Sequence, residues 1–184
     1  MSNYTFKSCV QNDDQEEIID LLYELKDELY LPDRAVCQQI TELCFANGGV
    51  IGGYDGDFLC AMMGYFYGTP ECDYVNSEVV FMYVAGIRKP YRMTRVFLNG
   101  LIFSLQQFQK AGAVAIRLQA EARNPYTNKL YSRFACPTGR SKSLRGKVVI
   151  TYSGSIKDAL DYVQSGKRKC TLPKRADEVL TAVC

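Results

Sequence analysis

The sequence has no histidine. That absence excludes Ser-His-Asp and Cys-His catalytic units and every metal site with a histidine ligand. Acid–base chemistry must therefore come from carboxyl, phenol, thiol or amine side chains, or from bound water. The chain also lacks an apolar run of about 18 residues, which a membrane-spanning helix requires. We therefore expect no membrane-spanning segment.

The chain has little excess of either charge, with 22 basic and 20 acidic side chains. Such a balance argues against a dedicated nucleic-acid binder. Apolar residues make up 47% and charged residues 23% of the 184 positions, which is typical of a folded domain. We expect one domain over residues 1–165 and a basic tail over 166–184. A basic, weakly hydrophobic terminus either docks on an acidic protein partner or stays mobile.

The chain has 8 cysteines but no C-x-x-C pair, so their spacing does not indicate a zinc site. The N-terminal segment MSNYTFKSC lacks the apolar core of a signal peptide. Several cysteines lie inside apolar runs such as FLCAMMGYF, where a thiol acts as a small hydrophobic side chain. We therefore expect free thiols, no disulfide and a cytoplasmic protein.

Hydrophobic periodicity divides the chain into strands and helices. The expected strands cover residues 4–10, 50–54, 58–67, 77–87, 114–121 and 146–152. The expected helices cover residues 12–30, 32–47, 95–110, 124–134 and 155–164. Asn12 or Asp13 is expected to cap the first helix, and Pro32 to lie in the first turn of the second. This order predicts an α/β fold with a mixed sheet flanked by helices.

A basic segment joins the strand expected over 77–87 to the helix expected over 95–110. Its cations are Arg88, Lys89, Arg92 and Arg95. Cations at a helix N-terminus oppose the helix dipole, at about 0.3–1 kcal/mol each when exposed. A strand–loop–helix connection with free backbone N–H groups is also a geometry that binds phosphate. The segment is therefore either a phosphate site or a solvated basic loop.

Two motifs resemble the GNAT superfamily of N-acetyltransferases. The family's cofactor loop reads roughly V-x-P-x-Y-R-G-x-G-I-G. The residues that fit this pattern are Ile87, Tyr91, Arg92 and Val96, with Pro90 offset by one position. Residues 124–134, NPYTNKLYSRF, resemble the family's N-x-x-A-x-x-L-Y-x-x-x-G-F stretch. The order of strands and helices also fits the family over most of the chain. The resemblance implies a GNAT-like acyl-CoA N-acyltransferase fold.

The resemblance also implies a reaction, in which an amine attacks acetyl-CoA directly. Tyr131 would be the general acid that protonates the departing thiolate. The base for the amine must come from elsewhere, and Glu121, at the end of a strand, is better placed than Glu78. Asn124 would lie near the pantetheine arm. The residues implied in cofactor binding are Val84, Ile87, Arg88, Arg92, Met93, Thr94, Arg95, Val96 and Asn124.

The sequence departs from the family pattern in the cofactor loop. Met93, Arg95 and Phe97 stand where the family has glycine or another small residue. Glycine there lets phosphate approach the backbone closely, so these side chains narrow the expected site, unless Arg95 pairs with a phosphate instead. The alternative is a GNAT fold that has lost its cofactor and serves as a structural or binding module, for example a phage virion or assembly protein.

Overall fold

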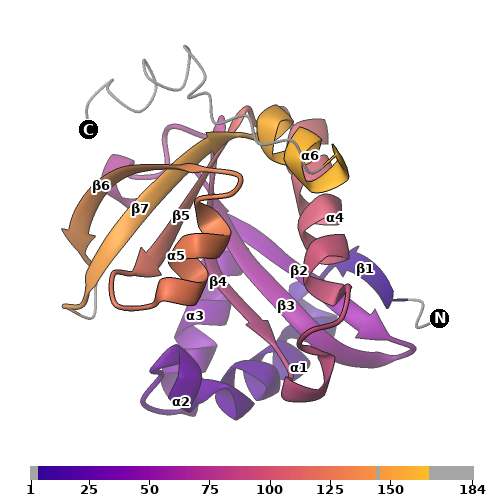
Figure 1. The fold of residues 1–184 in the computed structure, drawn as a ribbon. Helices are drawn as coiled ribbons and strands as arrows, with labels where there is room; N and C mark the ends of the chain where they lie inside the picture. Colours follow the sequence, from indigo (N-terminus) through magenta and orange to yellow (C-terminus); the bar gives the residue numbers. More distant parts are fainter. Residues whose placement is uncertain (1–3, 144–145, 166–184) are drawn as a thin grey trace. The chain divides into compact units, whose positions relative to one another are not determined.

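The computed structural model describes residues 4–143 and 146–165, so the basic tail predicted over 166–184 lies outside the described residues. The strands are β1 (Tyr4–Ser8), β2 (Gly48–Asp55), β3 (Phe58–Tyr67), β4 (Val79–Ile87), β5 (Ala115–Glu121), β6 (Cys136–Lys142) and β7 (Val148–Ser155). They form a mixed sheet in the order β1-β2-β3-β4-β5-β7-β6, flanked by helices (Figure 1). The predicted α/β fold with a mixed sheet is confirmed.

The helices are α1 (Gln11–Glu24), α2 (Lys26–Leu29), α3 (Arg34–Asn47), α4 (Val96–Lys110), α5 (Pro125–Tyr131) and α6 (Ile156–Ser165), with short 3₁₀ helices η1 (Pro70–Cys72) and η2 (Lys89–Tyr91). The described chain divides into two compact units. Unit 1 contains the residues up to Phe66 together with Tyr83–Ser104. Unit 2 contains Tyr67–Met82 and the residues from Leu105 onward.

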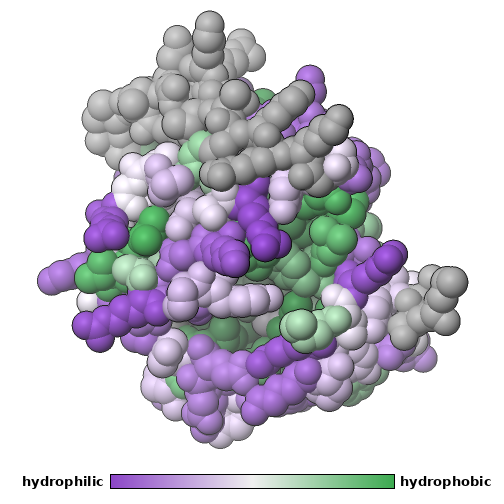
Figure 2. Space-filling model, in the orientation of Figure 1, coloured by the Kyte–Doolittle hydropathy of each residue, from purple (hydrophilic) through white to green (hydrophobic). Residues whose placement is uncertain are grey.

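Polar and charged side chains cover much of the face shown in Figure 2, with smaller apolar areas between them. The helices bury their apolar faces instead. In α1, Ile18, Leu21 and Leu22 are 0% exposed, and this helix packs against α3 within unit 1. The spacing of these residues is that of an amphipathic helix, which is why the sequence predicts a helix in this segment.

The ends of the first helices differ from the sequence prediction. Val10, not Asn12 or Asp13, is the N-cap of α1, and the helix breaks at Leu25 before α2 begins. The cap of α3 is Asp33, whose carboxylate accepts the Val36 N–H at 2.9 Å. Pro32 therefore precedes the helix instead of occupying its first turn. Val10 has no side-chain acceptor, so no local pattern identifies it as a cap, whereas Asp33 is a preferred N-cap residue directly after Pro32.

Asp14 stabilises the start of α1 from inside the helix. Its Oδ2 accepts the Val10 N–H at 2.7 Å, and its Oδ1 lies 2.8 Å from Lys7 Nζ. Tyr54 directs its hydroxyl at the same carboxylate, at 3.5 Å. Burial acts to raise the pKa of Asp14, but the hydrogen bonds from Lys7 and Val10 outweigh it and hold the pKa below its usual value. Asp14 therefore joins β1, α1 and β2 through one carboxylate.

The strands of unit 2 follow the sequence prediction closely, with one omission. Strands β4 and β5 are parallel neighbours, paired from Val79 with Ala115 to Met82 with Leu118. This confirms that the strands predicted over 77–87 and 114–121 lie side by side. Strand β6 was not predicted, because CPTGRSK lacks the apolar alternation on which a strand prediction depends. Its residues Pro137–Lys142 are exposed, and its described backbone pairing is with β7 alone.

The cysteines fall into two groups. Cys44 and Cys60 are free thiols, and both they and Cys37 are 0% exposed, as predicted for cysteines in apolar runs. Cys72 and Cys136 are disulfide-bonded, so the prediction that no disulfide forms is wrong. These two lie at the end of η1 and the start of β6, outside the apolar runs. The even number of cysteines is compatible with disulfides, but a disulfide between residues distant in sequence leaves no short spacing such as C-x-x-C to identify its members.

The Asp14 contacts predict a loss of stability in acid. Because the folded-state pKa lies below the unfolded value, the carboxylate stabilises the fold above the unfolded pKa, near 3.9, and this contribution disappears as the pH falls through the folded pKa. Asp14→Asn should cost roughly 1.5–3 kcal/mol at neutral pH and flatten the fall in unfolding free energy below pH 5. Urea unfolding from pH 7 to pH 2 measures both. Asp13→Asn, at the exposed neighbour, is the control, and equal losses in the two variants would contradict the prediction.

The disulfide-bonded state predicts a two-step labelling pattern. In protein isolated without reductant and unfolded in urea, iodoacetamide should modify Cys9, Cys37, Cys44 and Cys60. The Cys72 and Cys136 peptides should be modified only after reduction. Peptide mass spectrometry checks each site and identifies the bonded partners. Modification of Cys72 and Cys136 before reduction would show that they are free thiols.

Candidate functional site

The connection from β4 to α4 is anchored in the core of unit 1. Tyr91, at the end of η2, lies edge-on to Tyr4, with ring centroids 6.2 Å apart, and beside Phe58 at 6.3 Å. The rings of Tyr91 and Tyr4, together with Ile87, pack against the buried residues Cys60, Ala61 and Val96. The loop is therefore held by apolar packing, and its position does not depend on a ligand.

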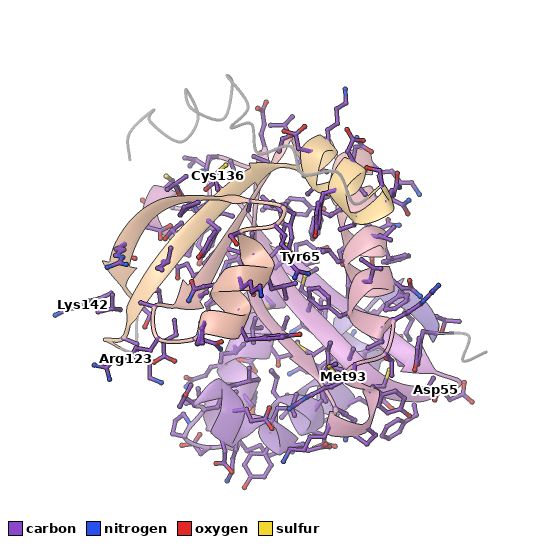
Figure 3. The ribbon with its side chains drawn as sticks, viewed as in Figure 1. Asp55, Tyr65, Met93, Arg123, Cys136 and Lys142 are labelled. Atoms are coloured by element: carbon purple, nitrogen blue, oxygen red, sulfur yellow. The ribbon has the colours of Figure 1, made fainter. Side chains whose placement is uncertain are left out.

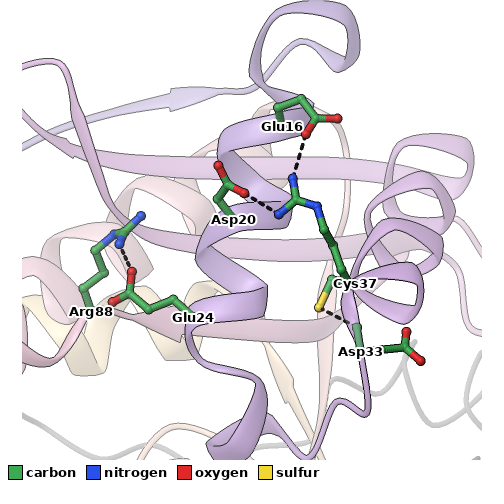
Figure 4. A network of polar contacts seen from close by, with 7 residues as sticks. Glu16, Asp20, Glu24, Asp33, Cys37 and Arg88 are labelled. Atoms are coloured by element: carbon green, nitrogen blue, oxygen red, sulfur yellow. Dashed lines mark hydrogen bonds and ion pairs between the residues drawn. The ribbon is translucent and has the colours of Figure 1, made fainter.

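Arg88 is held by its unit 1 neighbours. It forms an ion pair with Glu24 at the end of α1 (Figure 4). Its Nε donates to the Leu59 carbonyl oxygen at 2.9 Å, and its guanidinium lies 4.7 Å from the centroid of the Phe58 ring. The Arg88 side chain is 17% exposed. Arg88 thus interacts with a carboxylate, a backbone carbonyl and an aromatic ring of the protein itself.

Lys89 and Arg92 share a second carboxylate. Arg92 Nη2 lies 2.6 Å from Glu28 Oε2, and Lys89 Nζ lies 3.7 Å from Glu28 Oε1. Arg92 Nε also donates to the Ile87 carbonyl oxygen at 3.0 Å. Three of the cations expected near phosphate are therefore already paired with carboxylates. That Arg88 and Arg92 contact a phosphate stays a prediction.

The carboxylates belong to a row spaced by four residues along α1 and α2, which we call the acidic row. Its members are Glu16, Asp20, Glu24 and Glu28. Arg34 of α3 pairs with the first two, at 2.8 Å from Glu16 and in direct contact with Asp20 (Figure 4). The four-residue spacing is visible in the sequence, because side chains four apart share a helix face, but its cationic partners are not.

Met93 takes the place of a family glycine in the loop before α4 (Figure 3). Its φ is +65°, in the left-handed region that glycine adopts at no steric cost. Its side chain is 98% exposed, so it does not fill the space that the glycine would leave open. The narrowing expected from Met93 is therefore absent on this side of the loop.

The start of α4 combines a helix N-terminus with an exposed arginine. Thr94 Oγ1 accepts the Val96 N–H at 3.3 Å and donates to the Tyr91 carbonyl oxygen at 2.6 Å. The next N–H groups of the first turn have no partner within the helix. Arg95 is exposed and has no ion pair within residues 4–143 and 146–165. Backbone donors and one available cation thus remain for an anion.

The second group of expected site residues lies in unit 2, around α5. Asn124 caps this helix, since its Oδ1 accepts the Thr127 N–H at 3.0 Å. Glu121 ends β5, and its carboxylate lies 3.5 Å from Lys147 Nζ. Glu78 is exposed just before β4. Asn124 therefore has a structural task in any case, and a role beside the pantetheine arm stays a prediction, as does the choice of base.

Tyr131 closes α5 between two aromatic neighbours. Its ring lies edge-on to Tyr152, with centroids 5.8 Å apart, and to Phe134, at 6.0 Å. Burial raises the pKa of Tyr131 to about 12. Its hydroxyl makes no hydrogen bond with any residue that the structure describes. Tyr131 is therefore a phenol that stays protonated at neutral pH with its O–H available to a ligand.

The sequence did not identify Asn128 as a residue of the candidate site. Its Nδ2 donates to the carbonyl oxygens of Glu121 and Asn124, at 2.8 and 2.7 Å, and its Oδ1 accepts the Tyr152 O–H at 2.8 Å. The asparagine falls at a variable position of the family stretch, so the resemblance drew no attention to it. Its position, one helical turn after the Asn124 cap, was the feature of the sequence that could have indicated a role at the start of this helix.

Other site types receive no support from the described residues. Residues 4–143 and 146–165 contain no cluster of carboxylates and cysteines that could hold a metal ion. In the same ranges no helix is both long and apolar enough to cross a membrane.

The fold has clear counterparts among solved structures, although no family model and no curated protein matches the sequence. A Desulfovibrio desulfuricans protein described as a GNAT-family acetyltransferase matches with a TM-score of 0.68 at 12% identity, covering 84% of this chain and 99% of that one. An N-acetyltransferase from Staphylococcus aureus matches at 0.64 and 11%, covering 84% and 99%. A Bacillus subtilis acetyltransferase in complex with CoA matches at 0.63 and 12%, covering 83% and 99%. The fold is therefore that of the GNAT acetyltransferases.

Proposed function

We propose that the protein is an acetyl-CoA-dependent N-acetyltransferase acting on a primary amine. The observation that carries the proposal is the β4–α4 connection, which offers N–H groups and the available Arg95 within a fold shared with a CoA-bound acetyltransferase. A pyrophosphate needs such donors, because a helix N-terminus and a guanidinium both favour negative charge. The residues present fit acetyl-CoA, with Thr94, Arg95 and Val96 at the pyrophosphate.

Bound acetyl-CoA supplies an acetyl thioester. The amine nitrogen forms the new bond to the acetyl carbon, and the carbon–sulfur bond breaks with its electron pair leaving on sulfur. Tyr131 donates its O–H to that sulfur as negative charge develops there, since its phenol is protonated at neutral pH. The proton lost by the amine passes to Glu121 or to water, and the tyrosine recovers its proton from solvent.

A ligand titration tests the binding half of the proposal. Acetyl-CoA should raise the unfolding free energy by about 2.7 kcal/mol at a hundredfold excess over Kd. Arg95→Ala should weaken binding by roughly 1.5–3 kcal/mol, because it removes a charge-assisted phosphate contact. Glu28→Gln should strengthen binding, because Arg92 and Lys89 lose their carboxylate. Thermal-shift titration measures all three.

The matched control for Arg95→Ala is Lys110→Ala, the same loss of charge at the far end of α4. It should leave the affinity for acetyl-CoA almost unchanged. If millimolar acetyl-CoA fails to shift the melting temperature of the unmodified protein, the enzyme proposal is wrong, and a GNAT-fold binding module becomes the better assignment.

A second experiment tests the chemical half. Tyr131→Phe should keep the affinity for acetyl-CoA and lower kcat by roughly 10²–10⁴, the usual contribution of a general acid. Tyr126→Phe, at a tyrosine of the same helix that is 73% exposed, is the control and should leave kcat unchanged. Turnover is followed by thiol release with a panel of primary amines. If kcat is unchanged in Tyr131→Phe, Tyr131 is not the general acid.

A further inference from the structure

The geometry of α5 points to Asn128 as a positioning residue for Tyr131, acting through Tyr152. This inference rests on the proposed function, since it assigns Tyr131 the role of proton donor. It concerns three side chains of unit 2, none of which needs a ligand to be in place. The inference proceeds through three groups in contact: the amide of Asn128, the hydroxyl of Tyr152 and the ring of Tyr131.

The amide of Asn128 has one possible orientation. Its Nδ2 faces two carbonyl oxygens, those of Glu121 at 2.8 Å and Asn124 at 2.7 Å, so both of its hydrogens are used. Turning the amide over would place its oxygen against both carbonyls. Its Oδ1 must therefore face Tyr152, whose hydroxyl can only donate to it, at 2.8 Å. The end of β5, the start of α5 and β7 are thus joined by one side chain.

The hydroxyl of Tyr152 gains a fixed partner from this amide. Tyr152 is 4% exposed, and it pairs with Leu118 of β5 in the sheet. Burial raises its pKa, so the phenol stays a donor at neutral pH. A buried O–H without a partner carries a desolvation cost. The bond to Asn128 removes that cost only while the Tyr152 ring keeps its present direction.

The ring of Tyr152 in turn limits the ring of Tyr131. The two rings meet edge-on at 78°, and Phe134 meets Tyr131 from a second direction at 64°. No hydrogen bond to a described residue fixes the Tyr131 hydroxyl, so ring packing alone determines where its O–H points. Because a proton donor must be held within a fraction of an ångström of its target, a change in the Tyr152 ring changes the rate of proton donation.

The test uses Tyr152→Phe, which removes one hydroxyl and leaves the ring. We expect kcat to fall 3- to 30-fold with the KM for acetyl-CoA unchanged. In a Tyr131→Phe background the same substitution should have no further effect on kcat, because its influence passes through Tyr131. Asn128→Asp, which places an acceptor against two carbonyls, should behave like Tyr152→Phe and more severely. Tyr126→Phe is the control.

A readout that needs no turnover accompanies the kinetics. Ring-labelled tyrosine NMR should show the Tyr131 resonance, assigned by its loss in Tyr131→Phe, shifted or broadened in Tyr152→Phe and unchanged in Tyr126→Phe. Equal losses of kcat in both backgrounds, or an unshifted Tyr131 resonance, would overturn the inference. A displaced resonance in a protein that shows no turnover and no acetyl-CoA binding would instead refute the proposed function and leave the positioning intact.

Discussion

The acidic row on α1 and α2 is the constraint around which the rest of unit 1 is arranged. Carboxylates four residues apart on a helix repel one another, by a few tenths of a kcal/mol per pair, so the row needs cations from elsewhere in the chain. Arg34 of α3 supplies one, and Arg88 and Arg92 of the β4–α4 connection supply two more. These ion pairs therefore join the helix pair to the connection, in addition to the apolar packing of Ile87 and Tyr91 that holds the connection in place.

These ion pairs differ in strength. Arg34 is 47% exposed, and exposed pairs of this kind contribute about 0–1 kcal/mol because water and salt screen them. Arg88, at 17% exposed, also serves a backbone carbonyl and the face of Phe58, so its removal would leave several partners unsatisfied. Lys89, at 3.7 Å from Glu28, contributes least. An incoming anion therefore competes most easily for Lys89, then for Arg92, and hardly at all for Arg88.

Periodic elements were predictable from the sequence, and features that depend on distant partners were not. The alternation of β5 located that strand to within one residue. The apolar spacing of α1 located the start of the helix to within one residue but not its break at Leu25. Strand β6 has no such alternation, since its backbone pairing with β7 makes it a strand and its side chains remain in water. The disulfide-bonded Cys72 and Cys136 were missed for a related reason: their bonding depends on the fold and leaves no local pattern.

The candidate site shows the same division between local and distant information. The sequence identified the basic loop and Tyr131, because both stand in recognisable local patterns. The sequence prediction overstated the positive charge available to a ligand. Arg88 and Arg92 already form ion pairs with Glu24 and Glu28, which lie some 60 residues earlier in the chain and were not recognised as their partners. It also treated Met93 as an obstruction, although a left-handed backbone with an exposed side chain leaves the backbone donors accessible. What a loop offers to an anion is therefore set by the cations that its own fold leaves unpaired, and here that cation is Arg95 among the residues the structure describes.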